Sequence, residues 1–325
     1  MKSNKYVILL IVFVLFLTGS NYHVINASDG KKNNHTITSP YQYPVHVGSE
    51  EWNTLDLCEK REACRIPSEL IEKLTTKALL LSILDYPFIC DIELYSSIEE
   101  GIAVLQESFP PLNELLTRAD AIDTLEEYIT AFQQEETSDN DVISIKYWIA
   151  EDLYNYLIRQ QNSDAWTDPN NGFLVTRVYT PRHSPVNVYI DLSYEDHGTT
   201  QTKVQAYNSQ QVLIYGVNLL SHGSSSYNCH SYAWYSTSLQ NPYWMDNPGK
   251  YMTDGSYSPH NTPQVGDIVT YKYGNTLVHS GIVYSISPTI MVKSKWGCSG
   301  LFIHALGNCP YWNNGAQNCQ FWRAN

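Results

Sequence analysis

The chain has 325 residues, and 33 Asp and Glu against 20 Lys and Arg give it a formal net charge of −13 at pH 7. Its basic residues are not concentrated in any stretch, which argues against nucleic acid or an anionic membrane as a partner. The length is sufficient for two domains.

An export signal is predicted at the N-terminus. Lys2 and Lys5 precede an apolar run over residues 6–17, which is shorter than the roughly 20 residues that span a bilayer. This pattern is typical of a secretory signal peptide, and the small-residue exit ending at Ala27 predicts cleavage before Ser28. The mature protein is therefore expected outside the cell, soluble or associated with the cell wall, without stable membrane insertion.

Charge and composition divide the mature chain. Eight Lys and Arg and seven Asp and Glu lie in residues 166–325, and two Lys lie in the signal peptide, so residues 28–165 carry a net charge of −16. Residues 28–50 are polar without apolar periodicity, which predicts a flexible lead-in. A Pro/Asn/Gly-rich loop at residues 166–172 marks a boundary between an acidic α-helical domain (residues 51–165) and a second domain.

Helix signals recur through the acidic domain. Pro67 lies in the first turn of one predicted helix, Thr75 or Thr76 can cap the next, and Ser97 begins a capping-box pattern. Further helices are predicted over residues 112–118 and 121–132, and from the polar break at 135–140 to about residue 161. Because no convergent chemistry is visible here, we infer a scaffold or a module that binds a protein partner.

The second domain is predicted to be rich in strands. They cover residues 173–179, 186–194, 203–207 and 211–215, with a turn at 196–198 between two of them. His183, His197 and His222 have ligand spacing neither to one another nor to a Cys pair, so no metal site is predicted. No organic cofactor is implied.

The stretch Tyr227–Trp234, in sequence YNCHSYAW, carries the first candidate catalytic residue. Ser225, Ser226 and Asn228 can cap a helix that begins at Cys229. A thiol attacks as thiolate, and a helix N-terminus lowers its pKa through unsatisfied N–H groups and the peptide dipole. Cys229 is therefore predicted to be a nucleophile, with its own backbone N–H as an oxyanion donor.

Fifty residues further on, His279 is the candidate base. A strand is predicted over residues 268–271, His279 opens a second, and a turn at residues 287–289 leads into a third that ends at Trp296. A histidine at the mouth of a strand that faces a helix beginning with cysteine is the arrangement that a Cys–His pair requires.

The motifs YNCHSYAW, GDIV, HSGIV and SKWG resemble those of the NlpC-type and CHAP-type cell-wall hydrolases, which share a papain-like fold, over roughly residues 221–297. The resemblance implies an α+β domain with an antiparallel sheet, following the all-α domain. It also implies cleavage of amide bonds in peptidoglycan peptides, with Cys229 as the nucleophile and His279 as the base.

In the NlpC-type pattern a His, Asn or Gln on the next strand orients the base. Folding the hairpin about residues 287–288 places Trp296 opposite His279 and Ser294 on the same face, while the two lysines beside Ser294 point away. Ser294 is therefore the predicted orienting residue. A shift of one residue in the turn would reverse the faces. His304 is the rival candidate, and a backbone carbonyl or another side chain is the remaining alternative.

Two aromatic residues, Tyr232 and Trp296, are candidates for substrate binding, although aromatics at these spacings are as often part of a core. His230 directly follows the nucleophile and is expected to be a local hydrogen bonder instead of the base.

Seven cysteines in an exported chain leave at least one unpaired if disulfides form, which allows Cys229 to be a free thiol. One disulfide, Cys298 with Cys309 or Cys309 with Cys319, is expected to hold the C-terminal tail and is favoured over a zinc site.

The sequence thus predicts an exported cysteine peptidase or amidase that acts through a thioester on Cys229. Two alternatives stay open. One is a non-catalytic module that holds a wall peptide or a protein on a papain-like scaffold, and the other is a cysteine protease that acts on protein substrates.

Overall fold

Helices occupy the first half of the chain in the computed structural model, which describes residues 36–95, 97–135, 145–161, 173–191, 201–312 and 318–325. The predicted signal peptide, the loop at 166–172 and the turn at 196–198 lie outside these ranges. The helices of this half are α1 (Glu50–Thr54), α2 (Leu57–Ala63), α3 (Ser68–Ile71), α4 (Thr76–Leu84), η1 (Ile89–Leu94), α5 (Ile98–Ser108), α6 (Pro110–Thr117), α7 (Ala121–Glu135) and α8 (Ile145–Gln161). In the described part of the chain, no helix combines the length and apolar character needed to cross a bilayer.

Side-chain caps begin two of these helices where the sequence predicts them. The Thr75 hydroxyl accepts a hydrogen bond from the backbone N–H of Ala78 at 3.1 Å, and the Ser97 hydroxyl accepts one from Glu100 at 3.2 Å. These bonds satisfy N–H groups that the first turn of a helix leaves without an internal partner. The predicted starts of α4 and α5 are therefore confirmed.

Residues 36–49 pack against the helices without forming a helix of their own. Ile37 forms an isolated parallel bridge with Leu74, and the Tyr43 hydroxyl donates to the backbone oxygen of Ser82 at 2.9 Å. Tyr43 and Val45 are buried. This part of the predicted flexible lead-in is anchored instead, because its apolar side chains find partners in the helical core.

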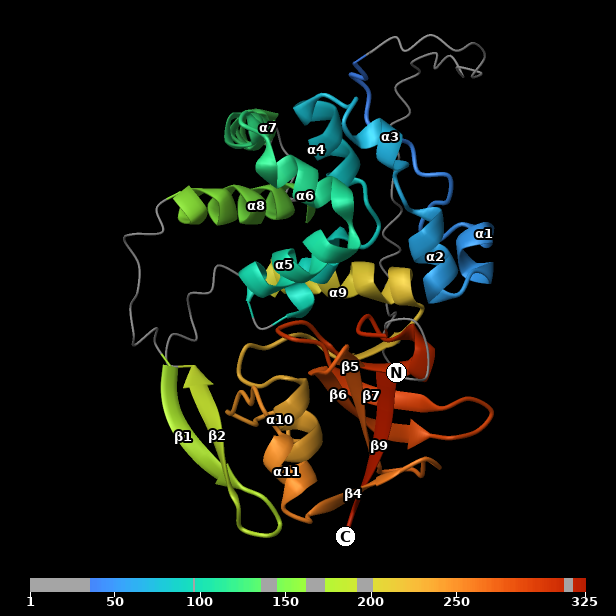
Figure 1. The fold of residues 1–325 in the computed structure, drawn as a ribbon, viewed down its shortest axis with the longest axis vertical. Helices are drawn as coiled ribbons and strands as arrows, with labels where there is room; N and C mark the ends of the chain where they lie inside the picture. Colours follow the sequence, from blue (N-terminus) through green and yellow to red (C-terminus); the bar gives the residue numbers. More distant parts are fainter. Residues whose placement is uncertain (1–35, 96, 136–144, 162–172, 192–200, 313–317) are drawn as a thin grey trace, which may run out of the picture. The chain divides into compact units, whose positions relative to one another are not determined.

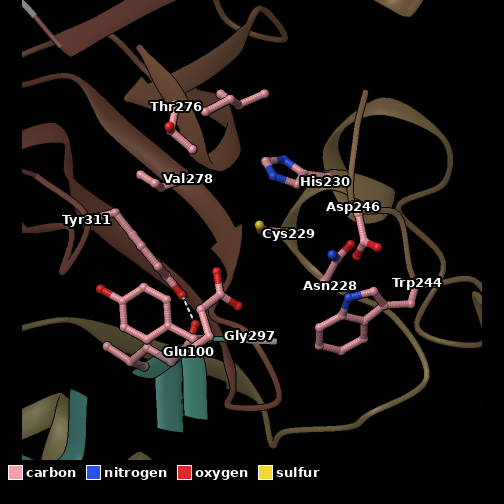
Figure 2. A pocket seen from close by; sticks show the side chains of 13 residues that line it. Glu100, Asn228, Cys229, His230, Trp244, Asp246, Thr276, Val278, Gly297 and Tyr311 are labelled. Carbon is pink, nitrogen blue, oxygen red and sulfur yellow. Dashed lines mark hydrogen bonds between the residues drawn. The ribbon is translucent and has the colours of Figure 1, made fainter. Parts of the chain in front are cut away.

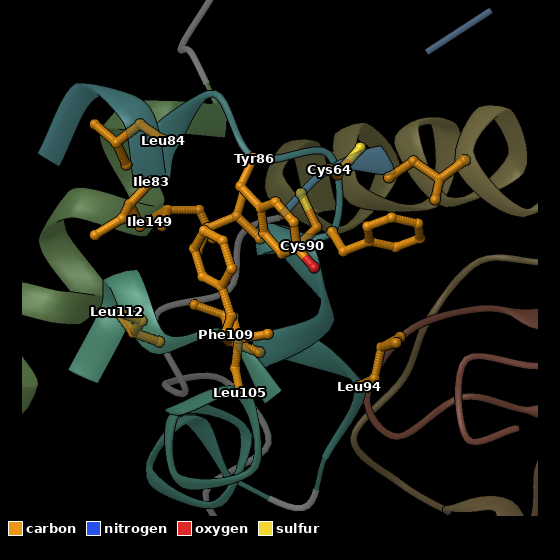
Figure 3. Packing of buried hydrophobic residues seen from close by; sticks show 14 of the residues in the cluster. Cys64, Ile83, Leu84, Tyr86, Cys90, Leu94, Leu105, Phe109, Leu112 and Ile149 are labelled. Atoms are coloured by element: carbon orange, nitrogen blue, oxygen red, sulfur yellow. The ribbon is translucent and has the colours of Figure 1, made fainter. Parts of the chain in front are cut away.

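One hydrophobic cluster holds the helices together (Figure 3). Tyr86 stacks on Phe109 with ring centroids 3.8 Å apart, and Ile83, Leu112 and Ile149 are fully buried in the same cluster. Burial of each such side chain contributes about 1.5–3 kcal/mol. The cluster continues into the second half of the chain through Tyr207, Tyr215, Val269, Tyr271, Trp296 and Tyr311.

The second half begins with two of the predicted strands, β1 (Phe173–Tyr179) and β2 (Pro185–Asp191), which pair antiparallel with each other. The strands predicted over residues 203–207 and 211–215 are wrong, because Gln201–Tyr215 forms a single helix, α9.

The buried side of α9 explains this error. Asn208 and Gln211 are fully buried, and their side-chain oxygens lie 2.8 and 2.6 Å from the Ser299 hydroxyl. A helix that buries polar side chains interrupts its apolar period of 3.6 residues. The remaining apolar residues then have the appearance of two short strands.

A seven-stranded sheet forms most of the second half, with strand order β3-β8-β7-β6-β5-β9-β4 and antiparallel pairing throughout. Its strands are β3 (Asn218–Ser221), β4 (Tyr257–His260), β5 (Ile268–Tyr273), β6 (Thr276–Ser285), β7 (Met291–Lys295), β8 (Leu301–Ala305) and β9 (Cys319–Ala324). The connections contain α10 (Cys229–Trp234), α11 (Gly249–Thr253) and η2 (Leu306–Asn308). The fold is thus α+β, with helices followed by antiparallel sheets (Figure 1).

The hairpin of β6 and β7 has the predicted register. Ile282 pairs with Lys293 and Val283 with Val292, as expected for a hairpin folded about residues 287–288. Among the described residues, this pairing extends towards the start of β6 only as far as Ile282.

The two faces of the sheet pack against different partners. Val269 and Tyr271 of β5 belong to the cluster shared with the helical half, whereas Ile268 packs with Ala233 and Trp234 of α10. Because successive side chains of a strand point to opposite faces, α10 covers the face that the helical half does not.

No two of the seven cysteines are joined by a disulfide bond. The expected bond of Cys309 with Cys298 or Cys319 is therefore not formed. Cys309 is fully buried, and Cys319 begins β9, which pairs with both β5 and β4. The C-terminal segment is therefore held by the pairing of β9 with β5 and β4, and not by a disulfide bond.

Candidate active site

Cys229 is the first residue of α10, as the sequence predicts. The side chain of Asn228 determines that start. Its Oδ1 accepts hydrogen bonds from Ser231 N at 3.0 Å and Met245 N at 3.2 Å, and its Nδ2 donates to Met245 O at 2.8 Å. Since Asn228 is buried, these bonds are shielded from water. The cap therefore places Cys229 and ties α10 to the segment around Met245.

The Cys229 thiol is shielded as well, with 6% of the residue exposed. Burial raises its pKa to about 12, although the backbone N–H groups of Ser280 and His230 and the charge of Lys295 act in the opposite direction. The start of the helix thus favours the thiolate, but desolvation outweighs it. In this state the thiol is protonated at neutral pH.

A cavity of about 310 Å³ opens beside Cys229. Figure 2 shows the sulfur atom pointing into it, with His230 on one side and Tyr311 on the other. The lining comes from the end of η1, the starts of α10 and β6, the loop at Trp244 and the segment after η2. Its volume lies at the lower end of the range for small-molecule sites, about 300–1,000 Å³.

His279 lies inside β6, fully buried, and not at the mouth of the strand. Its imidazole stacks on the ring of Tyr311, with centroids 4.0 Å apart and planes 9° from parallel. Among the residues that the structure describes, neither ring nitrogen has a hydrogen-bond partner, so His279 is not hydrogen-bonded to Cys229. Burial, followed by the nearby His304 and His230, holds the pKa of His279 well below its ordinary value.

The neighbour of His279, Ser280, is the residue that faces α10. Its hydroxyl accepts a hydrogen bond from Trp234 Nε1 at 2.9 Å and shares another with His230 Nδ1 at 2.9 Å. Adjacent residues of a strand point to opposite faces, so the His279 side chain points away from the cysteine helix. This differs from the expected arrangement. The prediction that His230 is a local hydrogen bonder is confirmed.

Ser294, the predicted orienting residue, is not hydrogen-bonded to His279. Its hydroxyl accepts a hydrogen bond from Trp296 Nε1 at 3.0 Å and lies 2.8 Å from His304 Nε2. Because His304 Nδ1 donates to the carbonyl of Ala305 at 2.9 Å, Nε2 is the acceptor and the Ser294 hydroxyl is its donor. The two candidates for the third position therefore bind each other.

The two aromatic candidates for substrate binding are core residues, and neither lines the cavity. Trp296 is fully buried and packs edge-on against Tyr215 at 5.3 Å. Tyr232 is 2% exposed and stacks on Tyr227 with centroids 6.1 Å apart. The contacts of both residues are packing contacts.

Lys295 was not among the predicted site residues. It points away from the face of His279, as predicted, but that direction leads to the face covered by α10. The side chain is fully buried, and its Nζ donates to the backbone oxygens of Ser224 at 2.9 Å and Gly297 at 2.6 Å. The alternation of side chains along β7, combined with the side on which α10 packs, is the signal that could have found it.

Two carboxylates, Asp246 and Glu100, also line the cavity. Partial burial and then the charge of Glu100 raise the pKa of Asp246, while hydrogen bonds from Tyr189 and Trp244 act to lower it. Within the described ranges, no group of three His, Cys, Asp or Glu side chains is arranged to hold a metal ion.

Comparison of the chain with protein-family models, with curated proteins and with solved structures finds no match. The likeness of the four motifs to cell-wall hydrolases therefore rests on the residues quoted above. Function has to follow from the chemistry of the site around Cys229.

Proposed function

We propose that this chain is an exported cysteine hydrolase that cleaves an amide or peptide bond, with Cys229 as its nucleophile. The observation that carries the proposal is the position of Cys229, at the capped start of a helix on an antiparallel sheet, beside a cavity. A papain-like hydrolase of the NlpC type combines these parts. The leading substrate is a peptidoglycan peptide, because the motif resemblance and the predicted export signal both point to the cell wall.

In the proposed reaction, His279 takes the proton of the Cys229 thiol, and the resulting thiolate attacks the carbonyl carbon of the scissile amide. The backbone N–H groups of Cys229 and His230 act on the sulfur and can donate to the oxyanion of the tetrahedral intermediate. The C–N bond then breaks, His279 protonates the leaving amine, and a thioester remains on Cys229. Water, activated by His279, hydrolyses the thioester to a carboxylate and restores the thiol.

His279 can enter this chemistry only after a rearrangement. Its ring lies against Tyr311, which also lines the cavity. The Tyr311 hydroxyl is bound to the backbone oxygen of Leu94, the dashed line in Figure 2. Because His279 lies on the face of the sheet opposite α10, the proposal requires a local change in the backbone of β6, as well as the departure of Tyr311, before the imidazole can reach Cys229.

Digestion of purified peptidoglycan by the mature protein, followed by mass spectrometry of the released fragments, tests this function. The wild type should release fragments with new amino or carboxyl ends. Removing the nucleophile with Cys229→Ala should slow their release by about a thousandfold or more.

Cys58→Ala is the matched control, because Cys58 is exposed on α2 and lines no part of the cavity. This variant should cut like the wild type. Absence of any fragment that depends on Cys229 would remove the cell-wall assignment.

A second candidate is a non-catalytic module that holds a wall peptide or a protein in the same cavity. The raised pKa of Cys229 and the absence of a hydrogen-bond partner for His279 favour it. Under this alternative, Cys229 reacts with iodoacetamide at pH 7 no faster than free cysteine does. Cys229→Ala would then bind wall peptides as tightly as the wild type, and neither protein would cut them.

A further inference from the structure

Lys295 is a fully buried ammonium group with neutral hydrogen-bond acceptors. Its Nζ is held by the backbone oxygens of Ser224 and Gly297, at 2.9 and 2.6 Å, and lies over the ring of Tyr227 at 5.3 Å. None of the ion pairs in the described residues includes it. Burying a cation in this way is costly unless an anion nearby compensates it.

The anchor points of Lys295 place it beside the nucleophile. Gly297 and Cys229 line the same cavity, and Tyr227, which lies under the ammonium, is two residues before Cys229. Lys295 and α10 also share one face of the sheet. Two thiols act electrostatically on Lys295, and each can become an anion. One is Cys298, which follows β7, and the other is Cys229, at the start of α10.

Burial lowers the pKa of Lys295 to about 8, an effect that Cys298 and Cys229 oppose. Lys295 therefore still carries most of its charge at neutral pH. In the same site, burial lowers the pKa of His230 to about 4, so this neighbour is neutral. The positive charge available to a thiolate at the start of α10 is thus that of Lys295.

We propose that Lys295 is the electrostatic partner of Cys229, whose thiolate it stabilises in the buried site. In the free protein, the thiol loses its proton to solvent through the cavity, and the resulting thiolate and the ammonium compensate each other's charge. This inference rests on the proposed function in one respect, namely that Cys229 is the nucleophile. Lys295 would act as a positioning residue, through the sulfur, without touching the substrate.

A purely structural role is the competing explanation, since Lys295 joins the loop at Ser224 to the end of β7. Such a role would lower the stability of variants without changing how Cys229 titrates. The pH dependence of thiol reactivity therefore separates the two.

The rate of Cys229 alkylation by iodoacetamide, measured from pH 6 to 10 by peptide mass spectrometry, provides the test. Lys295→Met keeps the length and apolar stem of the side chain but removes its charge. It should slow alkylation at pH 8 by about tenfold or more, equal to an upward shift of the thiol pKa by at least one unit.

Lys293→Met is the control. Lys293 is two residues earlier on the same face of β7 but only partly buried, so this variant should follow the wild-type profile. An unchanged profile for Lys295→Met would overturn the proposal, as would a shift confined to Cys298.

A second measurement keeps Lys295 in place, in case Lys295→Met does not fold. The charge coupling is reciprocal, so an anion at position 229 must raise the pKa of Lys295. In protein labelled with ¹³C-lysine, the assigned Lys295 Cε resonance should titrate at higher pH in Cys229→Asp, which carries a carboxylate at that position, than in the neutral Cys229→Asn. Equal titration in both proteins would overturn the pairing.

Neither measurement uses a substrate. If Lys295→Met changes the reactivity of the Cys229 thiol but no hydrolysis depends on Cys229, the pairing stands and the proposed function is wrong. If hydrolysis depends on Cys229 but the reactivity of the thiol does not depend on Lys295, the proposed function stands and the pairing is wrong.

Discussion

At the scale of single residues, burial sets the protonation states of the candidate site. It raises the pKa of Cys229 to about 12 and lowers that of His230 to about 4, so both are neutral at pH 7 in the closed state. Desolvation always disfavours the charged form of a group. Any activation of the thiol must therefore come from water or substrate in the cavity, or from fixed positive charge near the sulfur.

The stack of Tyr311 on His279 leads to a prediction at this scale. Tyr311→Leu removes the ring that covers the imidazole, so water gains access and the pKa of His279 should rise by roughly one to two units. NMR titration of the assigned His279 ring protons measures it. Tyr311→Phe keeps the stacked ring and loses only the bond to Leu94, so its His279 should titrate like that of the wild type. Equal pKa values in the leucine variant and the wild type would show that Tyr311 does not shield His279.

At the scale of elements, α10 is short and depends on its cap. It has six residues, fewer than an isolated helix needs to be stable in water. Asn228 accepts from Ser231 at its start and binds both the N–H and the carbonyl of Met245. The position of the nucleophile is thus determined by one buried amide.

Asn228→Ala should lower the free energy of unfolding by roughly 2–4 kcal/mol, because it removes the cap and leaves buried backbone groups of Met245 without partners. Urea denaturation of both proteins measures the loss. Ser225→Ala is the comparison, since Ser225 was an equally good capping candidate from sequence but does not cap α10. Its effect should stay within about 0.5 kcal/mol. Similar losses for the two variants would contradict this role of Asn228.

Several elements follow from local signals, and others do not. Thr75 and Ser97 cap α4 and α5 as predicted, since a cap involves residues three apart in the chain. The helix α9 was missed because its buried side carries Asn208 and Gln211, whose partner Ser299 lies almost ninety residues away. Local sequence contains no sign of such a distant partner.

At the scale of the whole molecule, a buried polar network joins the helices to the C-terminal segment. Arg61 of α2 donates to Asp91 of η1 at 3.1 Å and to the backbone oxygen of Pro310 at 3.1 Å. The Tyr215 hydroxyl, at the end of α9, also donates to Asp91, at 2.6 Å. Burial raises the pKa of Asp91 to about 6, although Arg61 and Tyr215 act to lower it.

Arg61→Met leaves the Asp91 carboxylate buried without its cation and should lower the free energy of unfolding by roughly 3 kcal/mol at pH 8. The pKa of Asp91 is higher in the folded protein than its unfolded value of about 3.9. Protonation of Asp91 therefore stabilises the folded state at low pH, and this stabilisation is lost as the pH rises through the folded-state pKa. Without Arg61 that pKa rises further. The loss should therefore be smaller at pH 5 than at pH 8.

Urea denaturation at the two pH values measures this difference. Arg65→Met is the control, because the ion pair of Arg65 with Glu62 is exposed and contributes little. An equal loss at both pH values would mean that Asp91 does not titrate with the network.

The candidate site was predictable in part. The start of the helix at Cys229, the register of β6 and β7 and the shared face of His279 and Ser294 follow from capping and strand alternation, which are local rules. Three features were not predictable: the stack of Tyr311 on His279, the bond between Ser294 and His304, and the burial of Lys295 beside α10. Each depends on segments that meet only in the folded chain.

The sequence by itself determined that Cys229 begins a helix and that His279 lies on a strand whose neighbour carries Ser294, because helix caps and hairpin register involve residues close in the chain. Only the tertiary structure decided which face of the sheet α10 covers. That choice depends on which apolar surfaces are buried together across the molecule, and it places Ser280 and Lys295, instead of His279, on the side of the cysteine helix.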